Sequence, residues 1–211
     1  MNLAFPDSCL VQFAKAPRPG RVKTRLQSVL GVQGCIALHR ALVEHVFATL
    51  QSGKIAHQEL WCSENDPYFS ALADPVAVPV RYQQGSDLGE RMSSAFADRL
   101  AHYRKVVLIG SDCPGLNAEY LKEAMRALDE EPVVLGPAED GGYVLIGLAE
   151  PLPALFRDVP WGSAQVLEVT RARLREVGKG WRELKILPDI DRPGDLRHLV
   201  GIEKLHFFSK N

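Results

Sequence analysis

The alternation of short apolar runs with helix-like segments constrains the fold of this chain more than any other feature. Runs such as 106–109 are apolar throughout, which is typical of a strand buried on both faces of a sheet. In 38–50, leucine or valine recurs every fourth residue, which is typical of one buried helix face. The expected strands are 9–14, 60–62, 76–80, 106–109, 133–135, 143–148 and 184–187, and the expected helices are 38–50, 87–102, 117–128 and 166–177.

Strands that alternate with helices along the whole chain predict a mostly parallel sheet with helices on both faces, a three-layer α/β/α fold. No composition shift or linker divides the sequence, so we expect a single domain over residues 1–211. Ligands of such sheets bind beyond the carboxyl ends of the strands. The loops that follow Ala14, Gln83, Ile109 and Leu135 are therefore expected to line one site.

Composition excludes several classes of protein. Hydrophobic residues make up 46% of the chain, which rules out a disordered or fibrous protein. The 25 basic and 26 acidic residues give a net charge of −1, so we expect neither a nucleic-acid nor a membrane partner. Four scattered cysteines without a CxxC pair, no leader-like segment and no long apolar run predict reduced thiols and a cytoplasmic location. Oligomeric state is not indicated.

Charge is uneven along the chain, because the segment that follows the first strand is strongly basic. It contains no acidic residue, and Gly20 gives its backbone freedom. Guanidinium and ammonium groups suit phosphate oxygens, although a solvated basic turn would have the same composition. The glycines of a Walker A loop are missing, since Pro17 and Val22 stand in their places. The predicted phosphate-binding cations of this segment are Lys15, Arg18, Arg21, Lys23 and Arg25.

A candidate metal ligand, Asp112, follows the expected central strand. A carboxylate at the end of such a strand is suited to Mg²⁺ or Mn²⁺, which prefer oxygen ligands and often bridge to substrate phosphates. The same residue could instead cap the helix that begins near Asn117. A serine nucleophile elbow is not indicated, because Ile109 replaces the first glycine of the GxSxG pattern.

Further acidic residues accompany glycines in the segment 136–143. Glu139 and Asp140 precede Gly141 and Gly142, so the carboxylates could contact hydroxyl groups or accept a proton while the glycines let a ligand approach. An acidic hairpin turn is the alternative, since Asp-Gly is a strong hairpin signal.

Two other segments have a functional and a structural interpretation. Asp87 and Arg91 lie where a strand leads into a helix, whose start could face a phosphate, although Asp87 is also suited to cap that helix. Asp191, in the acidic segment 189–195, is either a second metal ligand or a cap. The six histidines have no zinc-type spacing.

Four blocks of the sequence together resemble the DUF2064 family. They are F-A-K-A-P-R-P-G-R-V-K-T-R-L (13–26), D-L-G-E-R-M (87–92), L-I-G-S-D-C-P-G-L (108–116) and G-P-A-E-D-G-G-Y-V-L-I-G-L (136–148). Members are described as glycosyltransferase-A-like or nucleotide-diphospho-sugar transferase-like, with a Rossmann-like fold, and some are linked to arsenosugar biosynthesis. The resemblance implies that the basic loop holds nucleotide phosphates and that Asp112 holds a divalent metal.

Two departures from the related patterns concern the site. Nucleotidyltransferase relatives have a metal carboxylate in a late D-T-P segment, and Asp191 occupies that place with Arg192 where threonine is usual. The family pattern W-S-T reads Trp161-Gly162-Ser163 here, which leaves Ser163 as the hydroxyl that could contact substrate.

The resemblance and the motifs together predict a metal-dependent transferase that acts on a nucleotide-linked substrate. In glycosyl transfer from a nucleotide-sugar to a small acceptor, Asp140 is the expected base. In the alternative, nucleotidyl transfer, a phosphorylated small molecule attacks a nucleoside triphosphate, Lys23 stabilises the developing charge and pyrophosphate leaves. A nucleotide-binding module without turnover is a further alternative. The sequence identifies neither base, sugar nor acceptor, nor retention or inversion.

Overall fold

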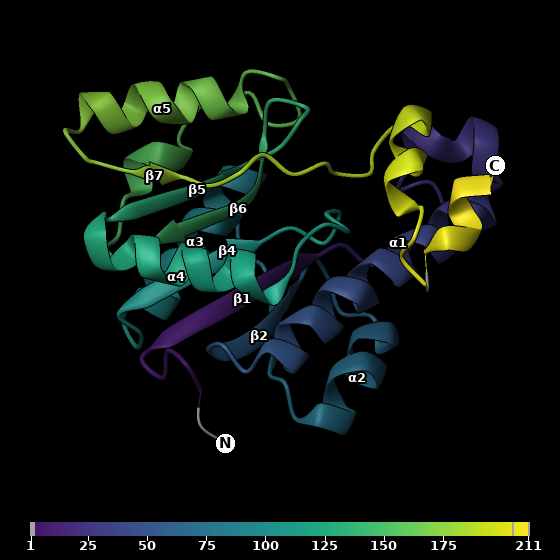
Figure 1. Ribbon diagram of the computed structural model, residues 1–211, viewed down its shortest axis with the longest axis horizontal. Helices are drawn as coiled ribbons and strands as arrows, with labels where there is room; N and C mark the ends of the chain where they lie inside the picture. Colours follow the sequence, from purple (N-terminus) through teal and green to yellow (C-terminus); the bar gives the residue numbers. More distant parts are fainter. Residues whose placement is uncertain (1–2, 204, 211) are drawn as a thin grey trace.

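The computed structural model describes residues 3–203 and 205–210 and contains one seven-stranded sheet (Figure 1). The strand order is β3-β2-β1-β4-β6-β5-β7, and neighbouring strands are parallel except where β6 pairs with β4 and β5. The predicted α/β class with a mostly parallel sheet is confirmed. The strands are β1 (Ser8–Ala14), β2 (His57–Cys62), β3 (Val80–Tyr82), β4 (Lys105–Ile109), β5 (Val133–Pro137), β6 (Tyr143–Leu148) and β7 (Arg182–Glu183).

Helices cover both faces of the sheet and complete the three layers. Helices α1, α2 and α4 pack on one face, and α3 and α5 pack on the other. Strand β1 shows the result, since Leu10 contacts the first layer while Val11 and Phe13 contact the second. Burial on both faces explains why this strand is apolar without alternation. The helices are α1 (Gln27–Gly53), α2 (Pro67–Ala73), α3 (Leu88–Leu100), α4 (Ala118–Glu130) and α5 (Val166–Glu176).

The structure differs from the predicted elements at both edges of the sheet. The segment 76–80 was expected as a strand, but Ala77 adopts a left-handed conformation (φ 54°) and β3 begins only at Val80. At the other edge β7 is Arg182–Glu183 rather than 184–187. Beyond Glu183 the pairing continues irregularly, since the amides of Leu184 and Leu187 still donate to the carbonyls of Leu135 and Pro137. The ladder is interrupted at Lys185, whose carbonyl accepts a 2.9 Å hydrogen bond from the Tyr120 hydroxyl. Helix α2 had no counterpart among the expected elements.

The antiparallel direction of β6 follows from the length of the preceding connection. Only residues 138–142 join β5 to β6, whereas a parallel crossover needs about a dozen residues or more. The hairpin interpretation of this acidic segment is therefore correct for its backbone: the amide of Ala138 donates to the carbonyl of Gly142 at 3.0 Å.

The C-terminal segment passes beside the carboxyl ends of the strands and returns to the N-terminal half of α1 (Figure 1). It contains 3₁₀ helices at Pro193–Leu199 and His206–Lys210. An apolar cluster joins this segment to the residues that follow the basic loop. The buried members of that cluster are Leu26, Cys35, Leu38, Leu42, Ile190, Leu196, Leu199 and Leu205.

Length and composition alone would allow one helical stretch, Thr24–Gly53, to cross a membrane. On one face of this stretch, Leu38 and Leu42 are buried against the C-terminal segment, and Val46 and Leu50 are buried against the sheet and α4. The four cysteines are also buried, and none forms a disulfide.

Candidate active site

The predicted meeting of loops at the carboxyl edge of the sheet is confirmed by a cleft of about 730 Å³. Lys15 follows β1, Gln83 follows β3, Asp112 follows β4 and Asp140 follows β5, and all four line the cleft. Residues from distant parts of the chain are thus brought together because parallel strands end at the same edge.

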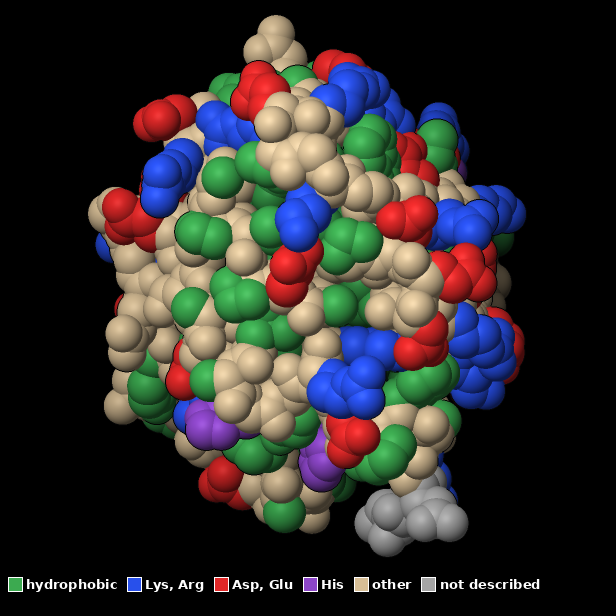
Figure 2. Space-filling view, turned by 90° about the vertical axis from the view of Figure 1, so that its left-hand side faces the viewer, with side chains coloured by type: hydrophobic (Ala, Val, Ile, Leu, Met, Phe, Trp, Pro, Cys, Tyr) green, Lys and Arg blue, Asp and Glu red, His purple; other side chains and the backbone are tan. Residues whose placement is uncertain are grey.

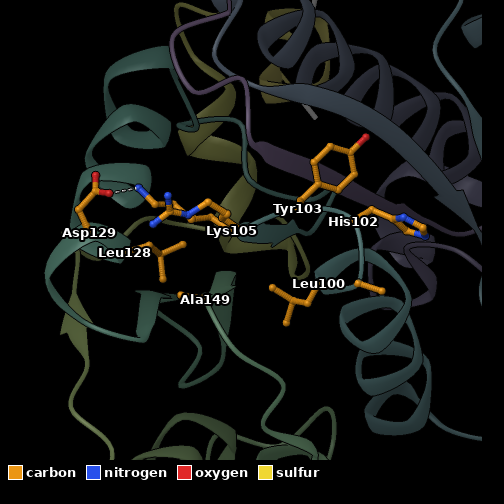
Figure 3. A pocket seen from close by; sticks show the side chains of 9 residues that line it. Leu100, His102, Tyr103, Lys105, Leu128, Asp129 and Ala149 are labelled. Carbon is orange, nitrogen blue, oxygen red and sulfur yellow. Dashed lines mark hydrogen bonds and ion pairs between the residues drawn. The ribbon is translucent and has the colours of Figure 1, made fainter.

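A second hollow, of about 500 Å³, lies at the opposite edge and has a different character. Figure 3 shows the Lys105 side chain there beside Asp129, with which it forms an ion pair. The ammonium group of Lys105 also donates to the carbonyl of Met125 at 3.0 Å, so its charge has protein partners. Figure 2 shows this side of the molecule, where positive and negative side chains are interspersed. We therefore build the site in the cleft at the carboxyl edge.

The centre of the cleft contains an ion pair between Lys23 and Asp112. The Lys23 ammonium lies 2.7 Å from Oδ1 of Asp112 and donates a hydrogen bond to the Ile190 carbonyl. The Lys23 side chain is only 3% exposed, whereas that of Asp112 is 49% exposed. One carboxylate oxygen of Asp112 is thus buried against lysine, and the remainder of the group faces the cleft.

The electrostatic surroundings keep Asp112 ionised. Burial alone would raise its pKa, but the nearby charges of Lys23, His39 and Lys15 outweigh burial and lower the pKa below its ordinary value. The alternative role of Asp112 as a helix cap is not what the structure shows. Asn117 caps α4 instead, because its side-chain oxygen accepts a 3.0 Å hydrogen bond from the amide of Tyr120.

Two more predicted phosphate ligands are engaged by carboxylates of the protein. Arg25 forms an ion pair with Asp191, so the side chain predicted as a second metal ligand already has a cationic partner. Arg18 lies 3.6 Å from Glu64 and 3.4 Å from Asp66. These arginines hold the loop to its neighbours.

The remaining cations, Lys15, Arg21 and Arg91, have no carboxylate within 4.0 Å among residues 3–203 and 205–210. All three line the main cleft and also a hollow of about 490 Å³ that continues from it. Gly20 (φ 69°) turns the loop between them in a conformation that favours glycine. Three uncompensated cations at the mouth of one cleft can attract an anion, and their phosphate-binding role stays a prediction.

Asp87, also predicted to bind phosphate, has a clear structural role. Its side chain accepts a 2.8 Å hydrogen bond from the amide of Glu90 and caps α3. It lines the cleft as well, next to Arg91. Capping and ligand contact are compatible, because a carboxylate has several lone pairs.

The predicted substrate-binding segment lies on the other side of the cleft. Asp140 is exposed, and its Oδ1 accepts a 2.8 Å hydrogen bond from the amide of Gly142. Gly141 has φ 89°, and a Cβ there would lie 2.3 Å from the carbonyl oxygen of Ala164. This close approach holds the turn against the segment that carries Ser163. Glu139 lies 3.8 Å from His198 at the outer rim.

Asp189 belongs to the site, although none of the sequence motifs indicated it. It lines the cleft beside Asp112 and Asp140. Burial, and then the negative charges of Asp140 and Asp112, raise the pKa of Asp189 to about 6, although Lys23 partly opposes this. The acidic segment 189–195 pointed to this region, and both Asp189 and Asp191 line the cleft. The sequence could not show that Asp191 is paired there with Arg25.

The donor set of the cleft fits a divalent cation. Asp112 and Asp189 offer carboxylate oxygens, which Mg²⁺ and Mn²⁺ prefer. Within the described part of the chain, no group of three or more His, Cys, Asp or Glu side chains is close enough to hold a metal alone. One or two carboxylates completed by substrate phosphates is a common arrangement for Mg²⁺.

Several solved structures have the same fold, and two of those described here are named as transferases. A "putative nucleotide-diphospho-sugar transferase" from Desulfovibrio desulfuricans G20 is 31% identical, with a TM-score of 0.88 over 98% of this chain and 95% of that one. The inositol-1-phosphate CTP transferase from T. maritima is 15% identical, with a TM-score of 0.60 over 100% and 98% of the two chains. Rv0371c from Mycobacterium tuberculosis H37Rv, in complex with manganese, is 14% identical, with a TM-score of 0.58 over 92% and 98%.

The last two structures are similar in fold alone, whereas the first is also similar in sequence. No curated protein matches the chain. The family model described as "Uncharacterized protein conserved in bacteria (DUF2064)" matches residues 46–163, more than half of the chain. The fold is that of the nucleotide-diphospho-sugar transferases, and the chain belongs to the DUF2064 family.

Proposed function

We propose that this protein is a divalent-metal-dependent transferase that moves a glycosyl group from a nucleotide-sugar to a small acceptor. The observation that carries the proposal is the opposition of charges across one cleft. Lys15, Arg21 and Arg91 lie at one end, and Asp112, Asp140 and Asp189 lie toward the other. A nucleoside diphosphate needs cations for its phosphates, and a metal needs carboxylates.

In this proposal the cations bind the nucleotide phosphates, and Lys23 keeps Asp112 in place and ionised. Asp112 and Asp189 would hold the Mg²⁺ or Mn²⁺. The chemistry that a divalent ion supplies at such carboxylates is neutralisation of the charge on the departing nucleoside diphosphate. Asp140 is exposed in the cleft, so it can take the proton from an acceptor hydroxyl.

Nucleotidyl transfer is the second candidate, and the fold shared with a CTP transferase favours it. Here the cations and Lys23 would bind a nucleoside triphosphate, and a nucleophile on the second substrate would displace pyrophosphate. This reaction uses the same phosphate-binding end of the cleft, so the two candidates differ in the leaving group and in the second substrate.

Calorimetric titration with nucleoside triphosphates and nucleotide-sugars, with and without Mg²⁺ or Mn²⁺, tests the proposal. We expect metal-dependent binding that Arg21→Gln weakens and that Arg18→Gln leaves within about threefold, since Arg18 already has carboxylate partners. Release of a nucleoside diphosphate indicates glycosyl transfer, whereas release of pyrophosphate indicates nucleotidyl transfer. Absence of nucleotide binding under every condition contradicts both.

A further inference from the structure

A smaller, mainly apolar pocket opens beside the carboxylates of the cleft. Its volume of about 290 Å³ is near the lower end of the range, about 300–1,000 Å³, that small-molecule sites have. Trp161 and Tyr143 form part of its wall, with ring centroids 6.4 Å apart and planes at 87°. Val144 and Val166 add aliphatic surface. A pocket of this size and lining suits one ring or a short hydrocarbon chain.

The polar groups at this pocket are acidic. Asp112, Asp140 and Asp189 line it, and no lysine or arginine does so within the part of the chain that the structure describes. A connected hollow of about 380 Å³ is also predominantly acidic. It has two arginines, of which Arg25 is paired with Asp191, against five carboxylates.

The two ends of the cleft therefore select opposite charges. An anionic group at the acidic end would lie against three carboxylates, of which only Asp112 has a lysine partner. A metal on Asp112 and Asp189 would leave Asp140 and Glu139 without a lysine or arginine within 4.0 Å among the described residues, although Arg192 lines the connected hollow with them. The cationic end, by contrast, has the three basic side chains without carboxylate partners.

Resting on the proposed function, we infer that the acceptor is an uncharged or cationic small molecule with an apolar body, and not a phosphate ester. Its apolar body occupies the pocket walled by Trp161 and Tyr143, and its hydroxyl or amino group lies at Asp140. This assignment favours glycosyl transfer over attack by a phosphorylated second substrate.

The transfer step balances with these groups. The acceptor hydroxyl gives its proton to the Asp140 carboxylate as its oxygen forms a bond to the anomeric carbon. A cationic amino group first gives one proton to Asp140, and the lone pair of its nitrogen then forms that bond. The bond between that carbon and the diphosphate oxygen breaks, and its electron pair leaves on the nucleoside diphosphate. No oxidant, reductant or further reactant is required.

A matched series of probes tests the inference: 3-phenylpropan-1-ol, 3-phenylpropylamine and 3-phenylpropyl phosphate. Each is titrated into the full-length protein with Mg²⁺, both alone and with the nucleoside diphosphate that binds best. We expect the alcohol and the amine to bind at least tenfold more tightly than the phosphate ester. Equal or tighter binding of the phosphate ester at this pocket, or no binding of any probe, overturns the inference.

Two variants locate the probes. Ser163 is half-buried and lines the pocket but not the main cleft. Ser163→Trp is therefore expected to narrow the pocket and to weaken binding of the alcohol and the amine at least tenfold, with a smaller effect on nucleotide binding. Asp140→Asn should reduce the preference for amine over phosphate ester at least fivefold. If both variants leave the probe affinities unchanged, the assignment of this pocket is wrong.

Nucleotide binding, measured in the same preparations, distinguishes failure of the acceptor assignment from failure of the proposed function. If the nucleotide binds and the probe preference is reversed, only the acceptor assignment fails. If the nucleotide does not bind to a folded protein, the proposed function fails. Thermal unfolding of each variant shows whether a lost affinity reflects the site or the fold.

Discussion

The two halves of the basic loop differ in what their charges contact. In the second half, Lys23 is buried against Asp112 and the Ile190 carbonyl, and Arg25 is paired with Asp191. In the first half, Lys15 and Arg21 face the cleft without a carboxylate partner among the described residues, and only Arg18 is near carboxylates, at the surface. Residues of the same charge in one short segment thus divide into a group that builds the site and a group available to a ligand.

Substitution of Asp112 is expected to have the largest effect, because it removes the partner of the buried cation Lys23. Asp112→Asn leaves the Lys23 ammonium buried, 3% exposed, without its counter-charge. Loss of one partner from a buried pair costs about 3–5 kcal/mol, so we expect the free energy of unfolding to fall by that amount in urea denaturation. A decrease below about 1 kcal/mol would mean that the pair does not stabilise the loop.

Replacement of the lysine should cost less than replacement of the aspartate. Lys23→Met removes the buried charge, and Asp112 keeps contact with water because half of its side chain is exposed. The Ile190 carbonyl loses its donor, so we expect a loss of about 1–3 kcal/mol in the same measurement. The double variant Lys23→Met/Asp112→Asn should be more stable than Asp112→Asn alone. If it is less stable, charge burial is not the cause.

For the cations that face the cleft without carboxylate partners, we expect substitution to weaken ligand binding and to change stability little. Arg21→Gln and Arg91→Gln should each weaken nucleotide binding by about 1.5–3 kcal/mol, roughly tenfold to over a hundredfold in calorimetry. The free energy of unfolding should change by less than about 0.5 kcal/mol in Arg21→Gln, because Arg21 has no ion-pair partner among the described residues. It should fall by about 0.5–1.5 kcal/mol in Arg91→Gln, because Arg91 Nε donates a 3.0 Å hydrogen bond to the Gly85 carbonyl. A large loss of stability with unchanged binding would reverse the comparison.

Arg18 provides the matched control with the smallest effect. It lies in the same loop, but its contacts are with Glu64 and Asp66 at a surface where its side chain is 45% exposed. Exposed ion pairs contribute about 0–1 kcal/mol, so Arg18→Gln should change stability by less than about 1 kcal/mol. Calorimetry should give a nucleotide affinity within about threefold of the parent protein. A loss equal to that of Arg21→Gln would place Arg18 among the ligand-binding cations.

Most of the fold was predictable because its signals are local. The apolar runs of β1, β4 and β5 and the spacing within α3 and α4 depend on residues a few positions apart. Strand direction is different. Strand β6 is as apolar as the parallel strands of the sheet, and only the short connection before it requires its antiparallel pairing with β4 and β5.

The site was predictable in position but not in the partners of its charges. The sequence placed five cations in one loop, yet nothing local distinguishes Arg21 from Arg25. That distinction comes from Asp191, 166 residues away along the chain from Arg25. Asp189 and Asp191 both line the cleft, and the same tertiary pairing engages the Asp191 carboxylate with Arg25.

The contact of Lys23 with the Ile190 carbonyl also sets an order of assembly. Ile190 follows every strand of the sheet in the chain, so the ribosome synthesises it after the basic loop and both helical layers. During synthesis the nascent chain can form its sheet before Lys23 and Arg25 acquire their late partners. The cleft therefore reaches its final form only when translation has passed the last strand, which makes competence for catalysis a late event in the biogenesis of the protein.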